Sequence, residues 1–218
     1  MIDDVVFLFD VDNTLLDNDR FQNELRGHLT ASHGDEGLKR YWGHFEELWS
    51  ELGYADYLGA VERYRLDAPH DASILRLGGW ILDYSFADLL YPGAIEAVRR
   101  ARQVGRTVVL SDGDAVFQPR KIDRSGLWRE FDGDVLIYVH KQMELAAIER
   151  AYPARHYVMI DDKLAILDAI KQVWGERVTT VFPRQGHFAF DSALIAKHPP
   201  ADTTIERIAD LMTSDLLK

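Results

Sequence analysis

The sequence contains no cysteine, which excludes disulfides, thiolate nucleophiles and cysteine-ligated metals. It also has no excess of basic charge, because 25 lysines and arginines stand against 36 aspartates and glutamates, for a formal net charge of -11. Such a chain repels a phosphate backbone, so we expect no nucleic acid as its main partner. The absence of cysteine suits a reducing compartment, and we expect a cytoplasmic protein.

Long hydrophobic runs are missing as well. The N-terminus, Met1-Ile2-Asp3-Asp4, is acidic and no long apolar stretch follows it, so we expect neither a signal peptide nor a membrane span. The hydrophobic fraction of 47% in 218 residues is nevertheless ample for a buried core. We therefore expect a soluble globular protein, built as one large domain or as a core with an insertion.

A short apolar run that ends in two acids is the most informative feature that is present. Residues 5–9 (VVFLF) lead directly into Asp10-Val11-Asp12. Such a run predicts a buried strand of a parallel sheet, and ligands gather at the carboxyl ends of such strands. Asp10 and Asp12 point the same way along an extended chain, where two anions repel each other unless a cation lies between them or one is protonated. The pair indicates a metal, a shared proton, or both.

The stretch from about Asp17 to Leu90 has helical periodicity and almost no strand-like alternation, which predicts a helical insertion. Further helices are expected over 54–64 and 73–84. We expect the aromatic residues of its clearest helix to pack inside the insertion, with a substrate wall or a dimer surface as the alternatives. These apolar residues recur at spacings of three and four: Leu38, Trp42, Phe45, Trp49 and Leu52.

After Pro92-Gly93 strands and helices alternate. This order predicts an α/β fold, a doubly wound parallel sheet whose strands end at one edge, with the all-helical domain inserted after the first strand. The predicted domains are a core of residues 1–16 and 91–218 and a helical domain of residues 17–90. The expected strands are 107–110, 135–139, 157–160 and 178–182, and the expected helices are 94–104, 121–125, 143–152, 164–174 and one from about Thr203.

Polar side chains follow three further strands of this predicted sheet. Ser111 and Asp112 follow the second strand, Lys141 follows the third, and Asp161 and Asp162 follow the fourth. Because the carboxyl ends of parallel strands meet at one edge, we expect these side chains to converge with the acidic pair of the first strand.

This set resembles the haloacid dehalogenase-like hydrolase superfamily over nearly the whole chain. The resemblance implies a Rossmann-like core with a helical cap that opens and closes over the site. LYPG at 90–93 is similar to the usual return from such a cap. The matching motifs are DVDNTL at 10–15, VVLSDGD at 108–114, VHK at 139–141 and VMIDDK at 158–163.

The resemblance also implies a role for each strand-end residue in phosphate ester hydrolysis. Asp10 would attack phosphorus and form an aspartyl-phosphate, while Asp12 would serve as general acid and base. Ser111 would donate to a phosphoryl oxygen, with Asp112 beside it among the substrate-binding residues. Lys141 would neutralise charge on the phosphoryl group and on the nucleophile.

A magnesium ion is the implied cofactor, because it is a hard cation that prefers oxygen ligands. The expected ligands are an oxygen of Asp10, the main-chain carbonyl of Asp12 and the carboxylate of Asp162. Asp161 would serve as a second or outer ligand.

Asp12 favours phosphate chemistry within the superfamily, since an alkoxide leaving group needs a proton and a halide does not. Dehalogenating members generally carry an aromatic residue at this position. We expect a magnesium-dependent phosphatase that acts on a small phosphorylated metabolite. The alternatives are a phosphomutase or 2-haloacid dehalogenase on the same scaffold, and a binding or regulatory protein of low activity. A homodimer is a further option for its assembly.

Two smaller features bear on the site. Asn13 stands where many superfamily members have glycine, and asparagine tolerates the unusual backbone angles such a turn requires. The segment 184–187 follows the last expected strand and could reach the active edge, although a solvated loop is the more usual role.

Overall fold

The computed structural model describes residues 2–217, and its centre is a six-stranded sheet in the order β3-β2-β1-β4-β5-β6. Every neighbouring pair of these strands is parallel. The order runs outward from β1 in both directions, so the switch point of the sheet lies between β1 and β4, where ligands bind in doubly wound folds. The strands are β1 (Asp3–Phe9), β2 (Arg106–Asp112), β3 (Val135–Tyr138), β4 (Ala154–Ile160), β5 (Val178–Pro183) and β6 (Thr203–Ile205).

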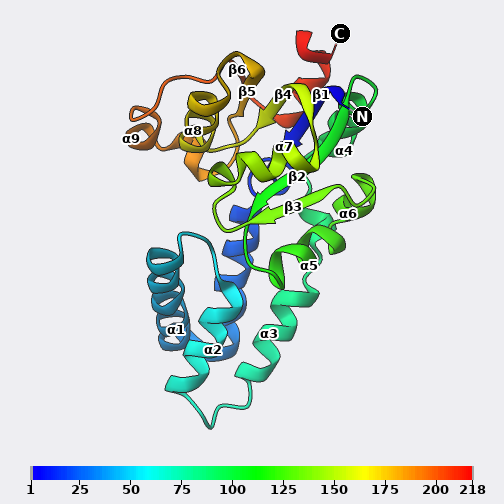
Figure 1. The fold of residues 1–218 in the computed structure, drawn as a ribbon. Coiled ribbons are helices and arrows are strands. Elements are labelled where there is room, and N and C mark those ends of the chain that lie inside the picture. Colours follow the sequence, from blue (N-terminus) through cyan, green and yellow to red (C-terminus); the bar gives the residue numbers. More distant parts are fainter. Residues whose placement is uncertain (1, 218) are drawn as a thin grey trace.

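Helices cover both faces of the sheet (Figure 1). Alternate residues of β1 serve two separate cores, as the two-residue period of a strand requires. Val6 and Leu8 pack with α7 and α8, whereas Phe7 and Phe9 pack with α4. The core helices are α4 (Ala94–Arg102), α5 (Phe117–Arg124), α6 (Leu127–Glu130), α7 (Leu145–Ala151), α8 (Leu164–Trp174) and α9 (Ser192–Ile195). Short 3-10 helices are Phe86–Leu89, Lys141–Met143, Gly175–Arg177, His187–Phe190, Ile208–Thr213 and Asp215–Leu217.

Three helices between β1 and α4 extend beyond the carboxyl end of β1 (Figure 1), and we call them the helical insert. The chain leaves and re-enters the core at adjacent points, because Leu16 and Leu90 form an antiparallel bridge. A break at Gly34, where φ is 68°, divides the first helix into two segments. The insert helices are α1 (Asn18–Leu52), α2 (Tyr57–Asp67) and α3 (Ile74–Asp83).

The aromatic residues of α1 divide between the interior and the core-facing end of the insert. Trp42 and Phe45 are buried, and Phe45 packs at 4.9 Å between ring centroids from Tyr57 of α2. Trp49 is only partly buried and lies 6.4 Å between ring centroids from Phe188 of the core. The first two therefore build the interior of the insert, while Trp49 faces the boundary with the core.

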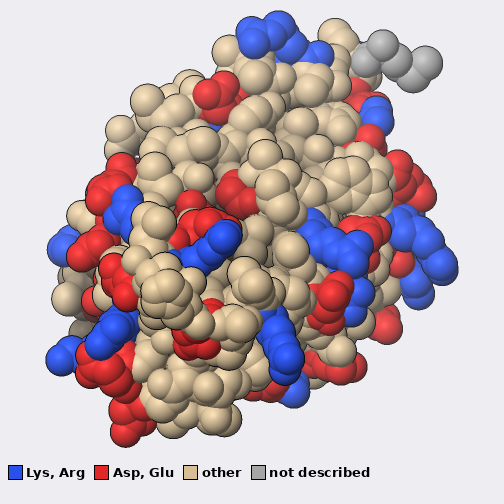
Figure 2. Space-filling model, turned by 90° about the horizontal axis from the view of Figure 1, so that it is seen from below, with Lys and Arg blue, Asp and Glu red and all other residues tan. Residues whose placement is uncertain are grey.

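Acidic and basic side chains are interspersed on the face viewed from the insert end (Figure 2). Ion pairs account for part of this pattern, for example Arg63 with Glu51 at 2.5 Å between Nη2 and Oε2. No helix within residues 2–217 combines the length and the apolar character needed to cross a bilayer.

The prediction of a C-terminal helix from about Thr203 is wrong. Residues Thr203–Ile205 form β6 instead, paired in parallel with β5, and the segment Ile208–Thr213 that follows is a 3-10 helix packed against α4. Two consecutive β-branched threonines favour a strand, and the free edge of β5 supplies the partner that local periodicity cannot reveal.

Three other elements differ from expectation in their bounds. Helix α5 begins at Phe117 rather than Lys121, because Asp114 Oδ1 accepts from the main-chain N–H groups of Val116 and Phe117 at 2.7 and 2.6 Å. Residues Ser111 and Asp112 lie at the end of β2 rather than after it. The expected helix over 143–152 is a 3-10 turn followed by the shorter α7.

Candidate active site

A compact turn carries the chain from β1 into the insert. The main-chain N–H of Asp10 donates to Ile160 O at 3.0 Å and so continues the ladder between β1 and β4 by one residue. Asn13 then adopts a positive φ of 58°, the backbone conformation that asparagine tolerates. Its Oδ1 accepts from the main-chain N–H of Asn18 at 3.0 Å, where α1 begins. The turn therefore fixes the directions of both the acidic pair and the insert.

Lys141 contacts two of the expected site carboxylates. Its side chain is 2% exposed, and its Nζ lies 2.5 Å from Asp10 Oδ1 and 2.7 Å from Asp161 Oδ2. It also donates to Leu110 O at 3.2 Å. Burial opposes the charged form, but the two carboxylates outweigh it and raise the pKa of Lys141. The ammonium therefore stays charged at neutral pH.

Two residues at the end of β2, Ser111 and Asp112, lie beside this lysine or contact its segment. Asp112 Oδ1 accepts from the main-chain N–H of Lys141 at 2.7 Å, so this acid orders the segment that carries the lysine. Ser111 is buried, and its Oγ accepts from Gln118 Nε2 at 2.9 Å. Both residues expected to bind substrate thus lie at the converging strand ends.

Three buried carboxylates form a candidate metal site. Asp10, Asp161 and Asp162 each offer an oxygen, and these oxygens lie within 4.8 Å of one another. Within residues 2–217 neither carboxylate oxygen of Asp162 has a hydrogen-bond partner. Burial raises the pKa of Asp10 to about 6, against the attraction of Lys141, and burial raises the pKa of Asp162 as well. Buried oxygens left without donors are the ligands that a hard divalent cation would satisfy, so the residues present fit magnesium.

Asp161 and Asp162 differ in how far the protein satisfies them. Asp161 Oδ1 accepts from the main-chain N–H of Lys163 at 2.9 Å, and its other oxygen pairs with Lys141. Neither carboxylate oxygen of Asp162 has a donor in the part of the chain that the structure describes, and its main-chain N–H donates to Thr14 Oγ1 at 3.1 Å. Asp162 is therefore the better candidate ligand for a cation, and an outer or second position stays the prediction for Asp161.

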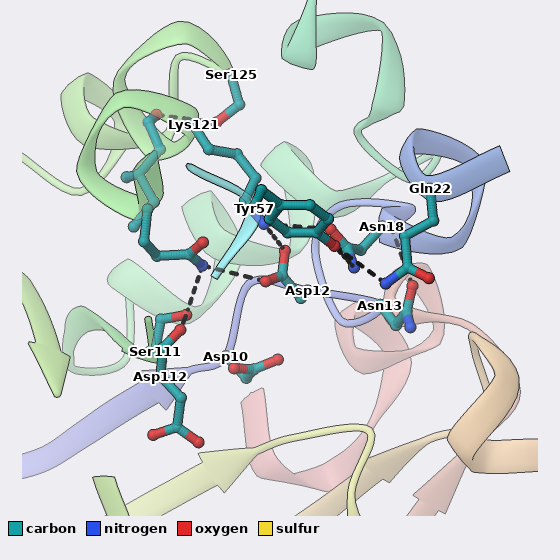
Figure 3. A network of polar contacts seen from close by, with 12 residues as sticks. Asp10, Asp12, Asn13, Asn18, Gln22, Tyr57, Ser111, Asp112, Lys121 and Ser125 are labelled. Carbon is teal, nitrogen blue, oxygen red and sulfur yellow. Dashed lines mark hydrogen bonds and ion pairs between the residues drawn. The ribbon is translucent and has the colours of Figure 1, made fainter. Parts of the chain in front are cut away.

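The carboxylate of Asp12 is not one of these three, and it belongs to a network of polar contacts with Lys121 (Figure 3). Its Oδ1 lies 2.5 Å from Lys121 Nζ, and its Oδ2 accepts from Gln118 Nε2 at 3.2 Å. Lys121 also donates to Asn18 Oδ1 at 3.2 Å. The main-chain carbonyl of Asp12 stays a predicted magnesium ligand, whereas its carboxylate faces Lys121.

Sequence reasoning missed Lys121, Gln118 and Asn18. A signal was present in the sequence. Phe117 and Ile122 mark the apolar face of a helix, and Lys121, four residues after Phe117, lies on the same face. An inward lysine is rarely buried without a partner, so its spacing could have suggested a carboxylate near it.

A cavity of about 60 Å³ lies between the core and the insert. Asp12 and Asp162 open onto it from the core, and Trp49 and Tyr57 line it from the insert. The segment 184–187 reaches it through His187 and the adjacent Phe188, whereas Arg184 turns to Glu206 at 3.1 Å. Side chains from both parts of the chain therefore enclose the space in front of Asp12 and Asp162.

Residues 5–173 match the haloacid dehalogenase-like hydrolase family. The chain belongs to this family. It is 58% identical to a haloacid dehalogenase-like hydrolase from Burkholderia xenovorans LB400, with a TM-score of 0.93 over 97% of this chain and 96% of that one. The assignment makes the protein a hydrolase with the predicted α/β core.

More distant members of the family share the fold. L-2-haloacid dehalogenase from Xanthobacter autotrophicus is 15% identical, with a TM-score of 0.63 and 98% of each chain covered. The HAD hydrolase YfnB from Bacillus subtilis, solved with bound magnesium, is 16% identical, with a TM-score of 0.62 over 96% of this chain and 97% of that one. A comparison with curated proteins finds no match. At these identities the two structures support the fold and leave the chemistry of this hydrolase to its own residues.

Proposed function

We propose that this hydrolase is a magnesium-dependent phosphatase that cleaves small phosphate monoesters. The observation that carries the proposal is the buried trio of Asp10, Asp161 and Asp162, in which both oxygens of Asp162 lack a donor within residues 2–217. Anionic oxygens at this density repel one another, and Lys141 supplies one unit of the positive charge that offsets this repulsion. A divalent cation would supply the rest.

In the first half of the reaction, an oxygen of Asp10 attacks phosphorus and the bond from phosphorus to the ester oxygen breaks. Asp12 gives its proton to the departing oxygen, so that a neutral alcohol leaves. Ser111 and Lys141 bind the phosphoryl oxygens. When bound, magnesium would offset the negative charge shared by the phosphoryl group and the nucleophile.

In the second half, water attacks the phosphorus of the aspartyl-phosphate. Asp12 takes a proton from this water, and the bond between phosphorus and Asp10 breaks to return the carboxylate and inorganic phosphate. The charge of Lys141 stabilises Asp10 as it leaves, because its ammonium already lies 2.5 Å from Oδ1.

The acid at position 12 favours phosphate esters over haloacids. A halide leaves without a proton, so an acid held beside the cavity would have no task in the departure of that leaving group. L-2-haloacid dehalogenase from Xanthobacter autotrophicus has the same fold, and one fold can host more than one chemistry. We therefore keep 2-haloacid dehalogenation as the alternative that the experiment must exclude.

The cavity supports a leaving group that is small and carries no negative charge. Three acids, Asp12, Asp112 and Asp162, line the cavity together with one lysine, Lys163. Burial opposes the charge of Lys163, but the carboxylates around it outweigh this effect and raise its pKa. We propose that residues 17–90 act as a cap, since Trp49 and Tyr57 close the space from the opposite side.

The test is product release from two substrate panels, one of small phosphate monoesters and one of 2-haloacids, with magnesium and with a chelator. We expect inorganic phosphate only with magnesium, and almost none from Asp10→Asn, whose amide is a poor nucleophile. Halide release without metal would support the dehalogenase instead. No product from either panel, despite magnesium binding, would support a binding or regulatory role.

A further inference from the structure

Lys121 of α5 is a buried ammonium that the mechanism above does not use. Its side chain is fully buried, and its Nζ lies 2.5 Å from Asp12 Oδ1 and 3.2 Å from Asn18 Oδ1. The Phe117 ring lies 5.1 Å from the same nitrogen. Burying an ammonium costs free energy, and an apolar side chain of similar volume would pack at this position without that cost.

We propose that Lys121 is a positioning residue that holds the Asp12 carboxylate in front of the leaving group and away from the metal trio. This inference rests on the proposed phosphatase function. It assigns a separate lysine to each acid of the pair, with Lys141 on Asp10 and Lys121 on Asp12. Each of the two lysines offsets the negative charge of one acid, which reduces the repulsion expected between two acids two residues apart.

The placement of Asp12 depends on α5 at two points. Lys121 holds one carboxylate oxygen and Gln118, one turn earlier in the helix, donates to the other at 3.2 Å. The same amide nitrogen of Gln118 donates to Ser111 Oγ at 2.9 Å. One turn of α5 therefore sets the separation between the proton donor and the serine expected to bind the phosphoryl group.

The insert completes this arrangement. Asn18, the first residue of α1, accepts from Lys121, and its Nδ2 donates to Tyr57 Oη at 3.4 Å (Figure 3). Removing the ammonium would leave the Asp12 carboxylate with Gln118 as its remaining donor within residues 2–217 and free to turn toward Lys141. The proton then reaches the departing oxygen less often, which matters most for esters of weakly acidic alcohols.

The experiment compares an alkyl phosphate, ethyl phosphate, with p-nitrophenyl phosphate in the presence of magnesium. For Lys121→Met we expect kcat on ethyl phosphate to fall about 100-fold and kcat on p-nitrophenyl phosphate to fall no more than about threefold. KM should change little for either ester, because Lys121 does not touch substrate. The double variant Lys121→Met/Asp12→Ala should equal Asp12→Ala alone, because Lys121 acts only through Asp12.

Two further variants keep the test decisive. Lys171→Met removes an ammonium that bonds Val178 O at 2.8 Å and Asp202 far from the pocket, so it should leave the ratio between the two esters unchanged. If Lys121→Met does not fold, Asn18→Ala loosens the lysine and should shift the ratio in the same direction by about tenfold.

The outcomes separate this inference from the function on which it rests. A wild-type protein that releases no phosphate from either ester overturns the phosphatase proposal. An active wild type whose Lys121 and Asn18 variants lose both activities equally, or whose double variant is worse than Asp12→Ala, overturns only the role of Lys121.

Discussion

Thr14 accepts a hydrogen bond on its side-chain oxygen from the main-chain N–H of Asp162, at 3.1 Å across 148 residues of sequence. Both residues are buried, and the bond joins the turn after β1 to the residue that follows the end of β4 by two positions. It therefore orients the acid whose carboxylate has no donor within residues 2–217. Ligand orientation by such neighbouring bonds typically changes metal affinity by about 10–100-fold.

Replacing Thr14 with valine should weaken magnesium binding about tenfold, since the isosteric side chain removes the acceptor and leaves Asp162 less constrained. The dissociation constant of magnesium, measured by calorimetry on the protein without substrate, checks this. Thr14→Ser keeps the hydroxyl and should bind magnesium nearly as the wild type does. Equal weakening in both variants would mean that the methyl group, rather than the hydrogen bond, matters.

Asp162→Asn should abolish the rise in melting temperature that magnesium gives the wild type. In chelator the same variant should melt at a temperature no lower than the wild type, because it removes a buried carboxylate that has no donor within the described chain. Asp161→Asn provides the contrast. Its carboxylate is held by Lys163 N–H and Lys141, so this change should lower the melting temperature even in chelator. A lower melting temperature for Asp162→Asn in chelator would contradict the interpretation.

Asp112 was expected to bind substrate. Its contact with the main-chain N–H of Lys141 indicates another role, that of holding the lysine segment in place, and the two roles can be tested against each other. Asp112→Asn keeps an acceptor for that N–H and should retain most of kcat, whereas Asp112→Ala should lose about tenfold in kcat as the lysine shifts. Steady-state kinetics on a phosphate monoester distinguish the two roles. A raised KM in both variants, with kcat preserved, would instead support the original expectation that Asp112 contacts substrate directly.

Much of the fold follows from local pattern. The run at 5–9 serves two cores by simple alternation, and the strand ends meet because a parallel sheet brings them to one edge. Helix α8 spans the expected residues, since its apolar spacing matches the face it buries. Strand β6 could not be found this way, because a three-residue strand depends on a partner 22 residues earlier in the chain.

The site shows a similar division. The identities of Asp10, Lys141 and Asp162 follow from strand-end position, which is a property of topology. The link between Lys121 and Asp12 spans 109 residues and depends on the angle at which α5 packs on the insert. Such an angle is set by tertiary packing, so no spacing in one sequence specifies which carboxylate a buried lysine meets.

Asp202 should make the pairing of β5 and β6 sensitive to pH. Its Oδ2 accepts from Thr180 N at 2.8 Å and from Lys171 Nζ at 2.9 Å; partial burial alone would raise its pKa, but these bonds outweigh it and lower the pKa below the usual value. A depressed pKa means that the stabilisation is complete above the unfolded-state pKa and is lost as pH falls through the folded-state value. Asp202→Asn should therefore reduce the free energy of unfolding by about 1 kcal/mol at pH 7, a low value for charged hydrogen bonds because the carboxylate is partly exposed, and by much less near pH 3. Urea denaturation at the two pH values checks this, and an equal deficit at both would show that the charge of Asp202 contributes nothing.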